Sequence, residues 1–173
     1  MNQTLVQLVL HAIQEKYVSE KAFYSDKLGI SPQSWDRWKK GEQGFKYDNM
    51  IILSTLFTDY EWMLVQKVVR NRDLMPDIIN DPVKEFEFLK YQIARRWIHA
   101  GLAQINWYHS EENELDSTRR SNMMILQIQI DYGLWGYNDV IEIRLPGVIR
   151  QQIGHDQVKL LQWFDDDSER LQE

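Results

Sequence analysis

The feature that most constrains this chain is a helix stop followed within three residues by a helix start, in the segment 28–32 (LGISP). The glycine has no β-carbon and can adopt the left-handed backbone that ends a helix. Ser31 can cap the next helix through its hydroxyl, and Pro32 suits a first helical turn. Residues 19–45 are therefore predicted to form two short helices joined by a tight turn.

Both helices are expected to have an apolar inner face. Ser19 is placed to cap the first helix, which carries Phe23 and Leu28 toward the interior. In the second helix Trp35 and Trp38 are three residues apart and so share one face. We expect the two indoles to anchor the second helix in the core.

The other faces of the second helix are polar. They carry amide, hydroxyl and charged side chains, namely Gln33, Ser34, Asp36, Arg37, Lys39 and Lys40. Such groups read base edges and contact phosphates. Gly41 provides a C-terminal stop, and helical spacing of apolar residues resumes from Tyr47 to Phe57.

The pattern L-G-I-S-x-x-S-x-x-x-W-x-x-G, from Leu28 to Gly41, resembles the helix-turn-helix core of phage-repressor-like (Cro/C1, XRE-type) DNA-binding domains. The resemblance covers about residues 4–70. It implies a transcriptional regulator that recognises a sequence in double-stranded DNA.

In such domains, the residues just after the turn and one helical turn further on face the major groove. These positions correspond to Gln33, Ser34 and Arg37 in this chain. The start of the preceding helix usually contacts a phosphate, which implies a role for Lys21. The chain departs from the family pattern at three places. Lys21 replaces the usual glutamine, Tyr24-Ser25 replaces the usual Leu-Ala pair, and Trp35 replaces the usual Ile or Val.

The charge distribution agrees with a DNA-binding first half. The net charge is −6, but residues 1–72 hold ten Lys/Arg against eight Asp/Glu (+2), and residues 73–173 hold ten against eighteen (−8). A surplus of +2 is small, so phosphate binding is expected to depend on a local cluster of Lys39, Lys40 and Lys46 with Arg37. A homodimer is then favoured, because two linked half-site readers bind more tightly than one.

Composition excludes other classes. The chain has no cysteine, hence no disulfide and no thiolate metal site, and 43% apolar residues are enough for a core. Nothing near the N-terminus resembles a signal peptide, and no apolar run reaches the roughly 18 to 20 residues that cross a bilayer. We expect a cytoplasmic protein without a membrane span.

A boundary is predicted where prolines and acidic or amide residues interrupt the helical pattern. It gives a DNA-binding domain at 1–72, a linker at 73–82 and a C-terminal domain at 83–173. Pro82 suits the start of a long helix, predicted to run to about Tyr108. Its apolar stripe consists of Phe86, Leu89, Ile93, Trp97 and Ala100.

That helix has a second apolar set, which widens the stripe beyond what one partner surface covers. The set is Phe88, Tyr91, Ile98, Leu102 and Ile105. One surface could face its own domain and the other a twin subunit, which would make this helix the dimerisation element. The alternative is a central core helix of a monomer.

After a polar segment at 110–122, read as a solvated loop or a short helix, the spacing changes to that of strands. Apolar residues alternate with polar ones over 124–132 and again over 141–145, with GLWGYND between them. A β-hairpin is predicted, followed by a terminal helix from about Val158 that runs into an exposed acidic tail. The expected fold class is mainly α, with a helix-turn-helix bundle and then an α+β region; an all-helical second half is the alternative.

Enzymatic and metal-binding classes have little support. His155-Asp156, with His99 and His109, could resemble a metal site, but such dipeptides are common by chance. Glycine-rich phosphate loops, serine elbows and cysteine nucleophiles are absent, so no catalytic residue, cofactor or metal is expected. The paired arginines Arg95-Arg96 and Arg119-Arg120 are more typical of salt bridges than of RNA contacts.

Two functions compete. The first is a dimeric regulator that binds DNA and uses its C-terminal region for dimerisation or for sensing a small-molecule or protein effector. The second is a protein-interaction module that uses a helix-turn-helix-like bundle only as a scaffold. The second function would be favoured by an exposed apolar patch, together with Arg37→Ala and Gln33→Ala variants that leave DNA binding unchanged.

Overall fold

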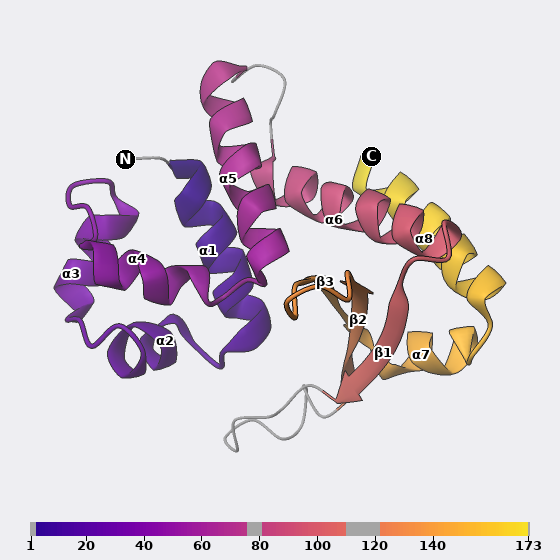
Figure 1. The fold of residues 1–173 in the computed structure, drawn as a ribbon. Helices are drawn as coiled ribbons and strands as arrows, with labels where there is room; N and C mark the ends of the chain where they lie inside the picture. Colours follow the sequence, from indigo (N-terminus) through magenta and orange to yellow (C-terminus); the bar gives the residue numbers. More distant parts are fainter. Residues whose placement is uncertain (1–2, 76–80, 110–121, 173) are drawn as a thin grey trace. The chain divides into compact units, whose positions relative to one another are not determined.

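The computed structural model describes residues 3–75, 81–109 and 122–172 (Figure 1). The chain divides into two compact units, Met1–Phe86 and Glu87–Glu173. The central residues of the predicted linker, 76–80, lie outside the described residues, as does the predicted loop at 110–121. The linker between 73 and 82 therefore stays a prediction.

Unit 1 is helical. Its helices are α1 (Gln3–Lys16), α2 (Glu20–Asp26), α3 (Pro32–Lys39), α4 (Tyr47–Ser54), α5 (Asp59–Leu74) and the first turn of α6 (Pro82–His99). α1 packs against α2 and α5, and α2 packs against α3. The core is formed by fully buried side chains from each of the first five helices, including Leu8, Ile13, Phe23, Trp35, Trp38, Leu53 and Val65.

The predicted stop and start between α2 and α3 are confirmed. The Ser19 hydroxyl accepts a hydrogen bond from the Ala22 backbone N–H at 3.2 Å, and the Ser31 hydroxyl accepts one from Ser34 N–H at 3.2 Å. Gly29 has φ +62°, in the left-handed region, and Pro32 is the first residue of α3. The local signals in the sequence therefore set this turn.

The prediction that one helix runs from about residue 83 to Tyr108 is wrong in its second half. α6 ends at His99, and Gly101 (φ +69°) follows it. Leu102 N–H donates to Trp97 O at 3.1 Å and Gly101 N–H donates to Ile98 O at 3.0 Å, the bond pair of a Schellman C-cap. Gly101 stops the helix despite the apolar spacing that continues past it.

Residues 104–109 form a strand instead. Unit 2 contains one antiparallel sheet of β1 (Gln104–His109), β2 (Met123–Asp131) and β3 (Asn138–Pro146), in the order β1-β2-β3. Ile105 pairs with Ile128, which in turn pairs with Ile141. The hairpin predicted from the alternation in 124–132 and 141–145 is confirmed, and the sequence analysis missed its third strand.

One face of this sheet belongs to the core. Leu126, Ile128 and Ile130 of β2 are buried and alternate with half-buried polar residues, and β3 shows the same alternation. α6 and α8 (Gln157–Gln172) lie side by side next to the sheet (Figure 1). Tyr91 of α6 packs edge to face on Phe164 of α8, with ring centroids 5.6 Å apart.

Two helices after the sheet complete unit 2. A seventh helix, α7 (Gly147–Ile153), which the sequence analysis did not anticipate, follows β3 and places Arg150 4.8 Å from the ring centroid of Trp107. The predicted terminal helix is confirmed, but it continues through the acidic segment to Gln172, so that segment is helical. The predicted class, an α-rich unit followed by an α+β region, is confirmed.

Among the described residues, no helix combines the length and the apolar character that crossing a membrane requires.

Candidate nucleic-acid interface

The two tryptophans of α3 fix one side of that helix. Trp35 and Trp38 are each 1% exposed, and their rings stack with centroids 4.8 Å apart. Phe45, just before α4, stacks on Trp38 at 4.8 Å with an interplanar angle of 10°. Aromatic contacts of this kind bury large areas with few rotatable bonds, so α3 is held in one orientation.

The opposite side of α3 faces solvent. A helix turns by about 100° per residue, so positions 33, 37 and 40 form one narrow stripe. Gln33, Arg37 and Lys40 are all exposed. We call these three residues the α3 outer stripe. It presents an amide and a guanidinium group from α3 and an ammonium group from Lys40, the C-cap residue of α3.

Glu20, the first residue of α2, ties α3 to α2. Its Oε2 accepts a hydrogen bond from Trp35 Nε1 at 2.6 Å and another from Lys39 Nζ at 2.9 Å. Burial raises the pKa of Glu20, but the hydrogen bonds from Lys39 and Trp35 and the charge of Lys39 outweigh it, and the pKa lies below its usual value. The carboxylate is thus stabilised in its charged form.

Lys39 consequently differs from the other predicted contact residues. Besides Glu20, it pairs with Asp36 Oδ1 at 3.3 Å. The hydrogen bond to Glu20 is the main cause that raises the pKa of Lys39 above its usual value. Two carboxylates therefore already compensate the charge of Lys39, and it is a less available phosphate ligand than Lys40.

Ser34 is half-buried and has a local role. Its backbone N–H donates to the Ser31 hydroxyl, and that hydroxyl donates to Ser34 Oγ at 3.1 Å. The Ser34 hydroxyl proton is not used in this pair. Ser34 therefore supports the start of α3 and retains one donor for a further acceptor.

The two predicted phosphate ligands outside α3 are also exposed. Lys21 is the second residue of α2, and Lys46 precedes α4 as its N-cap residue. The seven predicted residues thus come from three places in unit 1. Five of them are exposed, Ser34 and Lys39 are half-buried, and Lys39 is engaged by carboxylates.

Positions 24 and 35, two of those that depart from the pattern of the phage-repressor-like domains, are in contact. The ring of Tyr24 stacks on Trp35 with centroids 5.7 Å apart, and Phe23 meets the same indole edge to face at 6.2 Å. The larger Trp35 is thus matched by an aromatic side chain at position 24. The sequence analysis also missed Glu20; its partners lie 15 and 19 residues away, and no local pattern relates them.

Asp156, named in the sequence analysis beside His155, has a structural role. Its Oδ1 accepts hydrogen bonds from Val158 N–H at 2.9 Å and Lys159 N–H at 3.3 Å, so it caps the start of α8. His155 next to it is exposed. A capping role accounts for this aspartate without a metal.

No protein-family model, no curated protein and no solved structure matches this chain. The resemblance to phage-repressor-like domains accordingly depends on the residues of the motif and on the geometry of α2 and α3.

Proposed function

We propose that this protein is a sequence-specific transcriptional regulator that binds double-stranded DNA as a dimer, with α3 as the reading helix. The observation that carries the proposal is the α3 outer stripe, exposed on a helix whose other side is held by two buried indoles. A rigid helix with exposed amide and guanidinium groups fits the major groove.

Each residue of the interface has a proposed role that follows from its chemistry. Arg37 can make a bidentate contact with guanine and Gln33 with adenine, each worth roughly 1–3 kcal/mol of discrimination. Ser34 can donate its hydroxyl proton to an acceptor on DNA. Lys21, Lys40 and Lys46 would bind phosphates, and Lys39, held by Glu20, would mainly position α3.

The remaining parts of the proposal follow from this role. Unit 2 would serve dimerisation or the sensing of a small-molecule or protein effector. The protein would act in the cytoplasm, where it meets its DNA, and would control a promoter by steric block or by direct contact.

The test is selection from random duplex DNA with the purified full-length protein at low salt. We expect an enriched inverted repeat whose recovery is lost with Arg37→Ala. Arg96→Ala is the matched control, because Arg96 is an exposed arginine on α6 of unit 2. Absence of enrichment with the folded wild-type protein would reject the proposal.

The alternative is the protein-interaction module. The observation that favours it is a group of exposed apolar side chains on the β2–β3 loop. The protein-interaction alternative predicts that Arg37→Ala folds normally. It also predicts that neither the wild type nor Arg37→Ala has a salt-dependent affinity for DNA. The affinity of wild type for random duplex DNA at two salt concentrations separates the two functions.

A further inference from the structure

The loop between β2 and β3 exposes a concentrated group of large apolar side chains. Trp135 is 92% exposed, Tyr137 71% and Leu134 64%. Large apolar patches that rigid segments present to solvent mark interaction sites. We call Leu134, Trp135 and Tyr137 the loop anchor.

The backbone of this loop is well defined. Tyr137 N–H donates to Leu134 O at 3.0 Å, and the two residues between them, Trp135 (φ +59°) and Gly136 (φ +71°), both have positive φ. This is the pattern of a type I′ turn. Tyr132 Oη also donates to Asp139 Oδ2 at 2.6 Å across the loop. The loop anchor is therefore preorganised.

Trp135 is an unusual residue for its position, the first central residue of a type I′ turn. The first central residue of a type I′ turn is usually asparagine, aspartate or glycine, because a left-handed backbone crowds a β-carbon. Trp135 is the one non-glycine residue with positive φ among those described, and it is almost fully exposed, so no packing offsets the strain. Strain without local compensation points to a function for the side chain.

Charge limits the kinds of partner. Asp131 and Asp139 flank the loop on β2 and β3, and residues 131–139 contain no lysine or arginine. Phosphate-rich surfaces such as nucleic acids and anionic lipids would be repelled. A complementary surface needs exposed apolar groups beside cations.

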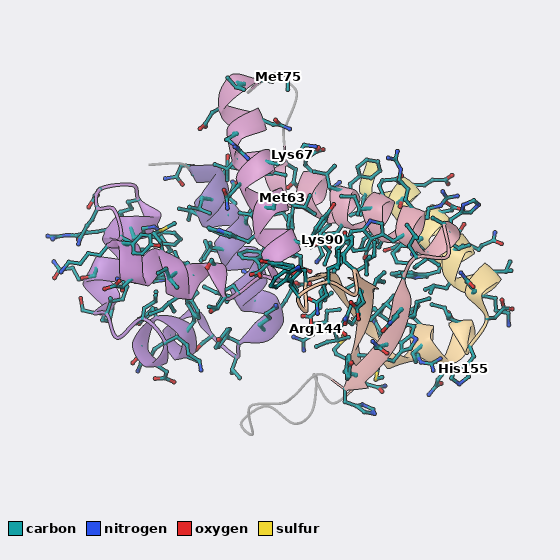
Figure 2. All side chains as sticks on the ribbon, in the orientation of Figure 1. Met63, Lys67, Met75, Lys90, Arg144 and His155 are labelled. Carbon is teal, nitrogen blue, oxygen red and sulfur yellow. The ribbon has the colours of Figure 1, made fainter. Side chains whose placement is uncertain are left out.

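This chain itself carries such a surface on α5. Met63, Lys67, Arg70 and Leu74 follow one another by four, three and four residues, which places them on one face of the helix. All four are exposed, and Figure 2 labels Met63 and Lys67 on α5. We call these four residues the α5 stripe; two cations lie between two apolar side chains.

We propose that the loop anchor of one copy docks on the α5 stripe of a second copy. The apolar groups of the loop anchor would meet Met63 and Leu74. Asp131 and Asp139, which flank the loop, would approach Lys67 and Arg70. The inference deepens the dimerisation part of the proposed function, and its test needs no DNA. The protein would self-associate in this way even if it did not bind DNA.

The first experiment is sedimentation equilibrium of the full-length protein without DNA. Trp135→Asn removes the anchor while keeping a residue suited to the turn, and Lys67→Glu with Arg70→Glu reverses the charges of the α5 stripe. We expect the wild type to dimerise and each variant to raise the dimer Kd by about tenfold or more, the usual effect of losing an interface anchor. Val158→Asn, an exposed apolar residue of α8, is the control that leaves the Kd unchanged.

The second experiment locates the contact. Because the chain has no cysteine, Asn138→Cys beside the loop anchor and Gln66→Cys beside the α5 stripe each introduce a single thiol. Copies of the two variants are mixed and treated with a short bifunctional thiol cross-linker. We expect the mixed pair to dominate, and Gln162→Cys in place of Gln66→Cys to abolish the preference.

Any of three results would overturn the inference: a monomeric wild type, a dimer insensitive to either variant, or cross-links distributed at random among the possible pairs. Arg37→Ala should dimerise like the wild type. A failed DNA selection combined with intact self-association would reject the proposed function alone.

Discussion

Trp35 Nε1 donates a 2.6 Å hydrogen bond to Glu20 Oε2, so the core indole of the proposed reading helix is tied to the first residue of the helix before it. The same carboxylate accepts a hydrogen bond from Lys39. One side chain therefore controls both the position of α3 and the availability of one of its cations. Removing its charge should affect stability in a pH-dependent way.

Glu20→Gln should lower the free energy of unfolding at pH 7 by up to about 1 kcal/mol, since the ion pair is partly exposed. The pKa of Glu20 is depressed in the folded protein, so its stabilisation is present above the ordinary glutamate value of about 4.3 and is lost as pH falls through the folded value. Urea unfolding of the wild type and Glu20→Gln at pH 7 and pH 3 measures the loss of stability at pH 7 and its disappearance at low pH. An equal difference between variant and wild type at the two pH values would contradict this.

Lys39→Ala and Lys40→Ala should have different effects. Lys39 has two carboxylate partners, so its loss should lower stability by about 0.5 kcal/mol and leave the salt dependence of DNA binding nearly unchanged. Loss of Lys40 should leave stability unchanged and reduce the slope of log affinity against log salt by about 0.9 per lost phosphate contact. Lys16→Ala, an exposed lysine at the end of α1, is the control for binding. Identical slopes for Lys39→Ala and Lys40→Ala would argue against the assigned roles.

Gly29→Ala should destabilise the protein by roughly 1–2 kcal/mol, the cost of a left-handed backbone with a β-carbon. A β-carbon at this position would meet no atom within 4 Å, so the effect is one of backbone conformation alone. Gly44→Ala is a matched control, because Gly44 has open space around it and no positive φ. Thermal unfolding should show a loss for the first variant and no loss for the second.

Trp135→Asn should leave the free energy of unfolding unchanged or raise it by about 1 kcal/mol, because asparagine tolerates the left-handed backbone. The same variant should weaken self-association. Calorimetry performed at a protein concentration below the dimer Kd separates the two effects. A clear loss of stability in the monomer would mean that Trp135 packs within its own chain.

Sequence reasoning succeeded where the determinants are local. The caps at Ser19 and Ser31, the turn at Gly29, and the burial of Trp35 and Trp38 depend on residues within one or two helical turns. The hairpin followed from a two-residue alternation. Each of these features has its physical cause inside a window of about ten residues.

The prediction was wrong where a segment contained two conflicting local signals. The apolar spacing past Ala100 favoured a longer helix, whereas Gly101 ended α6 and residues 104–109 paired with β2. The pairing of β1 with β2 joins residues that are 15 to 25 positions apart. An apolar spacing in one segment does not indicate which strand it will pair with. The missed third strand has the same origin.

The sequence by itself determined the turn between α2 and α3, the hairpin and the chemistry exposed on α3, because capping, left-handed glycines and side-chain periodicity act between near neighbours. Only the tertiary structure decided that Glu20 engages Lys39 and Trp35, that Tyr24 stacks on Trp35, and that β1 completes the sheet. These contacts join residues from different elements, and their existence depends on how the elements pack.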